Sequence, residues 1–227
     1  MKKSIIKLEN VWKTYKMGEL DVNALQGLDL NVKEGEFVAI MGPSGSGKST
    51  AVNMIGCLDV PTKGRILLDG HDISKLSESD LAQIRGKKIG FIFQQFNLIP
   101  TLSAIENVAL PMMFQGIPRE ERLEKAQKLL QMVDLHERID HRPTELSGGQ
   151  QQRVAIARSL VNEPEVILAD EPTGNLDSKT GEMVIGFLQK LNDQGRTIIM
   201  VTHDADVAKH ASRTEVLRDG KVVKRVK

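Results

Sequence analysis

The segment from Gly42 to Ser49 has the spacing of a phosphate-binding loop. It reads Gly-Pro-Ser-Gly-Ser-Gly-Lys-Ser, which matches G-x-x-x-x-G-K-[ST], and an apolar run comes directly before it. The glycines let backbone N–H groups curl around phosphate oxygens, and a helix that begins here adds the positive end of its dipole. Lys48 is predicted to reach the β- and γ-phosphates of a nucleotide, and Ser49 to ligate Mg²⁺. The loop residues predicted to bind the nucleotide are Gly42, Ser44, Gly45, Ser46, Gly47, Lys48, Ser49 and Thr50.

Two adjacent carboxylates follow another apolar run. Asp170 and Glu171 come directly after Val166–Ala169. Most Asp-Glu pairs are solvated surface charge, but a pair at the end of a buried strand in a P-loop protein favours a catalytic interpretation. Asp170 can hold the Mg²⁺ that Ser49 also touches. Glu171 is placed to orient or deprotonate an attacking water.

A second possible anion site begins at Leu146, in the sequence Leu-Ser-Gly-Gly-Gln. A serine and two glycines open onto a helix-forming stretch, so a second helix N-terminus is available to an anion. Taken alone, Ser147 is equally well explained as an ordinary N-cap.

The sequence predicts the base of the nucleotide less clearly than its phosphates. The chain lacks the Asn-Lys-x-Asp element typical of guanine-specific P-loop proteins, so adenine is the better prediction. Tyr15 and Trp12 are its only tyrosine and tryptophan, and both precede the phosphate loop. Either ring could stack on the base, although aromatic residues at such positions more often serve packing.

Short apolar runs predict the strands that position these residues. Each run is too continuous for a strand with one wet face, which indicates a largely parallel sheet buried on both sides. Polar residues follow every run, and open α/β sheets bind ligands beyond the carboxyl ends of their strands. One shared site is therefore expected. The runs are Phe37–Met41, Ile89–Phe93, Val166–Ala169 and Thr197–Val201.

Two Asp-Gly pairs, Asp69-Gly70 and Asp219-Gly220, predict hairpins and so an antiparallel addition. Between 101 and 161 the apolar spacing becomes helical, and Pro118 is suited to a helix start. The predicted fold class is α/β: a P-loop (RecA-like) core with a mainly parallel sheet, an antiparallel β addition and a helical insertion. We interpret 1–227 as one domain, with 1–95 and 163–227 as its core and 96–162 as a mostly helical subdomain.

Composition narrows the class of protein. Lys and Arg total 31 and Asp and Glu total 30 in 227 residues, so the charge balance does not favour a nucleic-acid partner. Cys57 is the only cysteine, which excludes an intrachain disulfide. No apolar run is long enough to span a bilayer, and the N-terminus does not resemble a signal peptide. We expect a protein that is soluble when isolated and reaches a membrane only through partners.

With these motifs in place, the chain resembles the ABC ATPase family, whose signature is Leu-Ser-Gly-Gly-Gln. The resemblance implies that Tyr15 stacks on adenine and that Gln94 binds Mg²⁺ or water and reports nucleotide state. It assigns catalytic roles to Glu171, His203, Lys48 and Gln94, and a metal site to Ser49, Gln94 and Asp170. The signature residues that it assigns to ATP are Ser147, Gly148, Gly149 and Gln150, and Asp177 matches the D-loop aspartate.

The branch of the family is also indicated. Phe96–Pro100, Glu106–Val108 and Pro172–Asp177 are similar to the lipoprotein-releasing, macrolide-exporting and cell-division branch. The resemblance implies an ATP-hydrolysing motor that drives export or release through separate integral membrane permease subunits, at the cytoplasmic face of the membrane. A cell-division-type ATPase that controls cell-wall enzymes is the nearest alternative, and a soluble ABC ATPase acting on nucleic acid is a more distant one.

Two phosphate-binding helix starts in one chain predict a homodimer. If the loop at Gly47 already wraps the β-phosphate, Ser147 can serve only the open side of the γ-phosphate. Head-to-tail pairing of two copies around two ATP molecules lets each signature serve the nucleotide of the other copy. The apolar stretch Phe96–Pro100 is predicted to form a docking groove for a membrane partner, with burial inside the helical insertion as the alternative.

Overall fold

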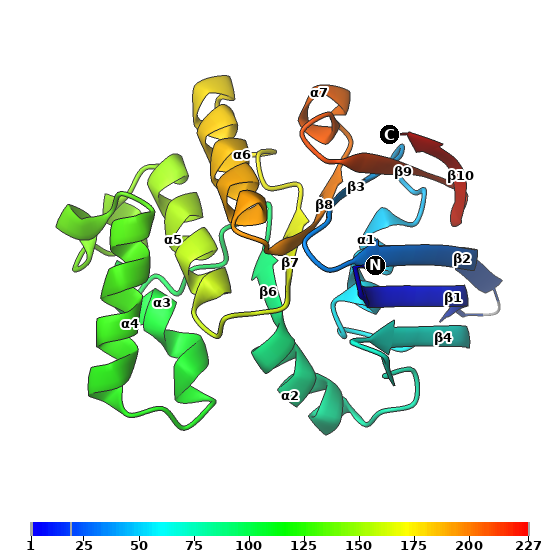
Figure 1. The fold of residues 1–227 in the computed structure, drawn as a ribbon, viewed down its shortest axis with the longest axis horizontal. Helices are drawn as coiled ribbons and strands as arrows, with labels where there is room; N and C mark the ends of the chain where they lie inside the picture. The colour runs from blue at the N-terminus through cyan, green and yellow to red at the C-terminus, as the bar shows by residue number, and fades with distance from the viewer. Residues whose placement is uncertain (1, 19, 227) are drawn as a thin grey trace.

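The main sheet has six strands, in the order β10-β9-β3-β8-β7-β6, in a computed structural model that describes residues 2–18 and 20–226. The predicted apolar runs form β3 (Phe37–Met41), β6 (Ile89–Ile92), β7 (Val166–Asp170) and β8 (Thr197–Thr202). Neighbours among these strands pair in parallel, and so does β9 with β3. The prediction of a mainly parallel core sheet is confirmed (Figure 1).

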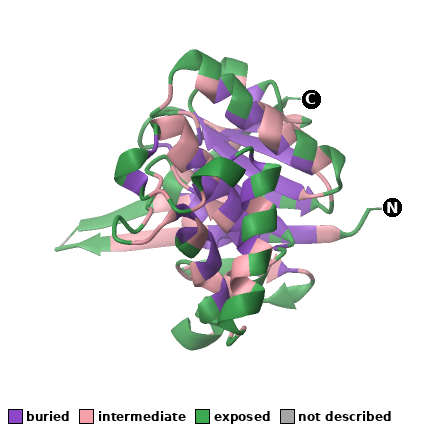
Figure 2. Cartoon of the chain, turned by 90° about the vertical axis from the view of Figure 1, so that its left-hand side faces the viewer, coloured by how far each residue is buried: buried purple, intermediate pink, exposed green. Residues whose placement is uncertain are grey.

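Both faces of this sheet are buried, because alternate side chains enter two different cores. Ile198 and Met200 of β8 belong to one hydrophobic cluster, and Ile199 and Val201 belong to the other. The first cluster contains apolar residues from the helices α3 to α7, whereas the second contains residues from α1, α2 and the other sheet. Figure 2 shows the resulting arrangement, with buried strands inside and exposed helix surfaces and turns outside.

A second, antiparallel sheet has the order β2-β1-β4-β5. Its strands are β1 (Ser4–Met17), β2 (Leu20–Lys33), β4 (Lys63–Leu68) and β5 (His71–Asp72). The Asp69-Gly70 pair joins β4 to β5, and Asp219-Gly220 joins β9 (Arg213–Arg218) to β10 (Lys221–Val226). Both predicted hairpins are therefore confirmed. The second of them extends the main sheet rather than the antiparallel one.

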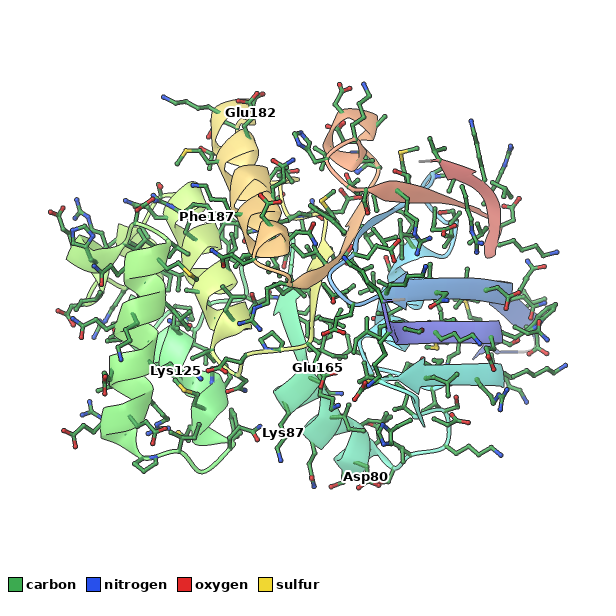
Figure 3. All side chains as sticks on the ribbon, viewed as in Figure 1. Asp80, Lys87, Lys125, Glu165, Glu182 and Phe187 are labelled. Carbon is green, nitrogen blue, oxygen red and sulfur yellow. The ribbon has the colours of Figure 1, made fainter. Side chains whose placement is uncertain are left out.

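Three helices lie between β6 and β7: α3 (Ala104–Met113), α4 (Arg119–Met132) and α5 (Gly148–Leu160). Pro118 is the N-cap of α4, as its fixed φ suggested. Short 3₁₀ turns, His136–Arg138 and Pro143–Glu145, connect α4 to α5. Lys125 of α4, labelled in Figure 3, pairs with Glu163 ahead of β7 at 2.6 Å.

The remaining helices are α1 (Lys48–Ile55), α2 (Glu78–Lys88), α6 (Ser178–Asp193) and α7 (Ala205–Ala208). Helix α1 follows β3 after the loop 42–47, and α6 follows β7 after a short turn (Figure 1). This order places the carboxyl ends of β3, β6, β7 and β8 at one edge of the sheet.

Candidate active site

The predicted phosphate loop turns from the end of β3 into α1. Gly47 is the N-cap of α1 with φ of 98°, a left-handed conformation that glycine adopts without strain. No side chain caps this helix and no acidic residue lies in its first turn, so its first N–H groups remain for an anion. Ser44, Gly45 and Ser49 are exposed. The loop thus has the backbone geometry that phosphate binding requires.

The phosphate loop is held between β2 and the C-terminal hairpin. A Cβ at Gly42 would lie 2.3 Å from the carbonyl oxygen of Leu217, and one at Gly47 would lie 2.6 Å from that of Ala24. The N–H of Gly220 donates to the carbonyl of Ser46 at 3.0 Å. The pair Asp219-Gly220 predicted the hairpin. No neighbouring residues in the sequence indicated that its turn would support the phosphate loop.

Lys48 and Asp170 lie close enough for their charges to interact. The Lys48 ammonium donates to the carbonyls of Gly42 (2.8 Å) and Pro43 (2.9 Å). Asp170 is the last residue of β7. Burial raises the pKa of Asp170, the neighbouring Glu171 carboxylate raises it further, and Lys48 opposes both effects. A cation added beside Asp170 would favour its ionised form.

Glu171 and His203 are brought together from the ends of β7 and β8. His203 Nδ1 and Glu171 Oε1 lie 2.8 Å apart, and the side chain of Glu171 is 16% exposed. With a donating Nδ1–H, the histidine orients this carboxylate. Glu171 has φ of 46°, an uncommon conformation for a residue other than glycine. Strain of this kind is frequent at functional sites and is retained only where surrounding contacts hold it.

Gln94 lies just beyond β6 and contacts Asn175, a residue to which the sequence assigned no role. Its Nε2 donates to Asn175 Oδ1 at 3.4 Å, and Asn175 Nδ2 donates to the Gln94 carbonyl at 3.0 Å. The Gln94 amide also lies against Gly174, where a Cβ would be 2.8 Å from Nε2. Gln94 is thereby tied to the segment that leads to Asp177, the N-cap of α6.

Ser147 is the N-cap of α5. Its Oγ accepts from the N–H of Gln150 at 3.3 Å, while Gln150 Oε1 accepts from the N–H of Ser147 at 2.8 Å. This is a capping box, so the simpler interpretation of Ser147 describes its contacts within one chain. A Cβ at Gly149 would lie 2.3 Å from Thr180 Cγ2, which explains why the backbone here needs glycine.

The signature helix and the helix of the phosphate loop contribute to different cores. Buried residues of α5 belong to the cluster on one face of the main sheet, and those of α1 belong to the cluster on the other face. Figure 1 shows β7 and β8 between the two helices. The structure therefore brings Glu171 to His203 and Lys48 to Asp170, but it leaves Ser147 with its own helix.

Tyr15 lies on β1 beside α1. Its hydroxyl is 3.2 Å from Asp59 Oδ2, and Lys13 Nζ lies 5.1 Å from the centre of its ring. Burial and the Asp59 carboxylate raise the pKa of Tyr15, with burial the larger cause. The ring is only half-buried, so it is available for stacking next to the phosphate loop.

The fold and this site define a P-loop nucleotide-binding domain in which Ser147 caps the start of a second helix. Comparison with known proteins is more specific. A family model described as ABC transporter matches residues 25–174. The uncharacterised ABC transporter ATP-binding protein MJ0796 of Methanocaldococcus jannaschii is 56% identical over 223 residues, covering 96% of this chain and 95% of the relative.

Two further matches add detail. The macrolide export ATP-binding/permease protein MacB of Brucella melitensis is 52% identical over 219 residues, which cover 96% of this chain and 34% of that protein. The dimeric structure of MJ0796 in a post-hydrolysis state with ADP and Pi superposes with a TM-score of 0.90 at 54% identity, covering 98% of each chain.

The chain belongs to the ABC transporter family. It is an ATP-hydrolysing cassette that binds ATP, the motor subunit of a transporter, as the resemblance to this family implied. Within residues 2–18 and 20–226, none of the helices has the length and apolar character needed to cross a membrane.

Proposed function

We propose that two copies of this chain close head to tail around two ATP molecules and drive export or release through separate membrane permease subunits. The observation that carries the proposal is the placement of α1 and α5 against opposite faces of the main sheet. A signature that lies away from its own phosphate loop is available to the nucleotide of a second copy. The solved structures of MJ0796 are dimers, which supports a dimer here.

Mg²⁺ fits the oxygen donors beside the phosphate loop. Among the described residues, no group of three or more His, Cys, Asp or Glu could hold a metal. Mg²⁺ commonly takes one or two protein ligands together with substrate phosphates. The Ser49 hydroxyl and the Asp170 carboxylate would supply these ligands, and Gln94 could join by exchanging its bond to Asn175. When bound, the ion neutralises charge on the β- and γ-phosphate oxygens.

Each of the proposed catalytic residues has a separate role. Lys48 exchanges its loop carbonyls for phosphate oxygens, and the free N–H groups of α1 bind the β-phosphate. Glu171 accepts a proton from the attacking water, or orders that water, while His203 holds the carboxylate through Nδ1. Ser147 of the other copy completes the γ-phosphate contacts. The four residues act mainly by positioning and charge stabilisation.

Tyr15→Ala is expected to lower ATP affinity by roughly 1–3 kcal/mol, the usual scale for base–aromatic stacking. The affinity for inorganic triphosphate should hardly change, because it has no base. Tyr15→Phe is the matched control, since it keeps the ring and loses only the hydroxyl, which contacts Asp59. Titration of all three proteins with both ligands measures the effect. Equal losses for ATP and triphosphate would show that Tyr15 supports the fold and does not stack.

A groove of about 400 Å³ beside Gln94 suits a membrane partner. Apolar residues line it, among them Leu58, Phe91, Phe93 and Pro111, and the two phenylalanine rings stack with centroids 5.3 Å apart. Two arginines lie in the same groove, and its lining contains no carboxylate. An amphipathic helix that carries an acidic residue therefore has the complementary chemistry.

Both arginines of the groove are fixed by backbone carbonyls. Arg85 Nη1 donates to Cys57 at 2.6 Å, while Arg158 donates to Asn97 at 2.6 Å and to Phe96 at 2.9 Å. Burial lowers the pKa of Arg158. An acidic partner residue would offset the desolvation of these cations. The bonds of Arg158 join the groove to the segment directly after Gln94, which gives nucleotide state a route to the permease.

The groove lies mostly outside Phe96–Pro100, the stretch that the sequence favoured as the docking site. Within Phe96–Pro100, only Asn97 lines the groove. Leu98 packs against the hydrophobic cluster that contains residues of α3 to α7, and Ile99 is 38% exposed. We therefore propose that the permease contacts Arg85 and the phenylalanines, and that Leu98 contributes to the core.

Arg85→Glu should weaken capture of the permease at least about tenfold, because it places a negative charge opposite an acidic partner. Lys87→Glu is the matched control: it makes the same charge change on α2, at an exposed residue outside the groove (Figure 3). Immobilised wild-type cassette first identifies the membrane protein retained from detergent-solubilised native membranes. The amount retained by each variant is then measured, along with its melting temperature and ATPase rate. Equal capture by both variants, with unchanged stability, would exclude this groove as the docking site.

A further inference from the structure

Gln152 is a buried polar residue that none of the motifs above uses. It lies on α5, two residues beyond the signature, and its exposed fraction is 0%. Its Nε2 donates to the carbonyl of Pro172 at 2.6 Å and approaches that of Phe93 at 3.5 Å. A single amide thus connects the signature helix with the chain beyond β7 and the chain beyond β6.

Each of these carbonyls belongs to a neighbour of a predicted catalytic residue. Phe93 directly precedes Gln94, and Pro172 directly follows Glu171. The backbone at Glu171 is left-handed, with φ of 46°, so the turn depends on surrounding contacts. Gln152 supplies one such contact from inside the protein.

The orientation of the Gln152 amide follows from its neighbours. Both nearby groups are carbonyl oxygens, so the NH₂ group must face them and Oε1 faces the other way. In the described residues, Oε1 is buried without a hydrogen-bond partner. An unpaired buried acceptor is destabilising. Methionine would fill nearly the same volume without that penalty, so packing alone does not account for a glutamine.

We propose that Gln152 is a positioning residue that links the signature helix to the turns presenting Gln94 and Glu171. The inference rests on the proposed head-to-tail dimer, in which α5 contacts the nucleotide of the other copy while Glu171 acts on its own. Movement of the signature on closure is then transmitted through one amide to the turn that carries Glu171. Hydrolysis at one site becomes sensitive to engagement at the other.

Gln152→Met tests the link, because it removes the donor while keeping the length of the side chain. We expect kcat for ATP hydrolysis to fall at least about tenfold, since small displacements of a catalytic group lower rates strongly. ATP affinity, measured on the monomer, should stay within about twofold of wild type, because Gln152 lies away from the phosphate loop.

Gln152→Glu provides a second measurement. The protonated acid can donate to Pro172, whereas the ionised form would face that carbonyl with a negative charge. Burial raises the pKa of a carboxyl. The ratio of its kcat to that of wild type should therefore rise as the pH is lowered from 8 to 6. If Gln152 only filled space, any change in this ratio would follow the pH dependence of the melting temperature of the variant, which is measured in parallel.

Asn192→Ala is the control for loss of a similar bond. Asn192 Nδ2 donates to the carbonyls of Arg196 at 2.9 Å and Gly35 at 3.3 Å, at the C-terminal end of α6. It should lower the melting temperature as much as Gln152→Met does, or more, and keep the wild-type kcat. Wild-type kcat in Gln152→Met, or a loss of kcat that merely follows the melting temperature in both variants, would overturn the positioning role. Failure of the dimer itself would appear separately, because Glu171→Gln with Gln152 intact would then form no dimers in the presence of ATP.

Discussion

Glu171→Gln is expected to lower kcat for ATP hydrolysis by about 10²–10⁴-fold, the range that a positioned general base contributes. The amide keeps the size of the side chain and can still contact His203, so the site retains its shape. It cannot accept the proton of the attacking water. ATP affinity should remain near the wild-type value, because neither the phosphate loop nor Tyr15 changes.

The same variant should trap the closed dimer. If the γ-phosphate joins the two copies, a protein that binds ATP without cleaving it stays paired. Size-exclusion chromatography of Glu171→Gln, with and without ATP, measures this, and ADP serves as the ligand control. The double variant Lys48→Ala/Glu171→Gln should remain monomeric with ATP, since it lacks the charge that grips the phosphates. Monomeric Glu171→Gln at saturating ATP would count against both the catalytic role and the dimer.

The sequence predicted the strands of the main sheet because of their burial. β3, β7 and β8 are covered on both faces, so nearly every residue in them is apolar and the runs are continuous. β1 and β2 left no such pattern. Their outer halves are partly exposed, and register shifts between Leu8 and Trp12 interrupt the alternation of side chains. A strand with bulges and polar residues does not differ enough from a loop to be predicted from one sequence.

In the candidate site, too, motifs made of adjacent residues could be predicted, whereas contacts between distant segments could not. Lys48, Asp170 and Ser147 belong to short motifs. Spacing was enough to predict the phosphate loop, the buried strand before Asp170 favoured a catalytic interpretation, and the role of Ser147 came from the family resemblance. The bond from Gln152 to Pro172 and that from Gly220 to Ser46 join segments far apart in the chain. No local pattern encodes them, because they arise only once α5 and the C-terminal hairpin pack against the sheet. Asn175 lay within a segment singled out by resemblance. Its bond to Gln94 could not be predicted, because it joins two segments that meet only in the folded chain.

Ser147→Arg is expected to abolish ATP hydrolysis while leaving ATP binding by the monomer near the wild-type level. The reason is the position of α5, which lies against the opposite face of the main sheet from α1. A bulky cation at Ser147 would occupy the place of the γ-phosphate held by the second copy, without touching the nucleotide held by the same chain. Loss of the N-cap costs about 0.5–2 kcal/mol, so the melting temperature is measured in parallel to show that the variant is folded.

Mixing two inactive variants decides whether the signature acts on its own chain or on its partner. Lys48→Ala has a defective phosphate loop and an intact Ser147, and Ser147→Arg has the reverse. In a head-to-tail dimer, the intact loop of one variant meets the intact Ser147 of the other, so one complete site forms. The mixture should therefore hydrolyse ATP faster than either variant alone, and the rate should follow the fraction of mixed dimers. If the loop and Ser147 served one nucleotide within a single chain, neither variant would contain a complete site. The mixture would then stay inactive, and Ser147→Arg would lose monomer affinity as Lys48→Ala does.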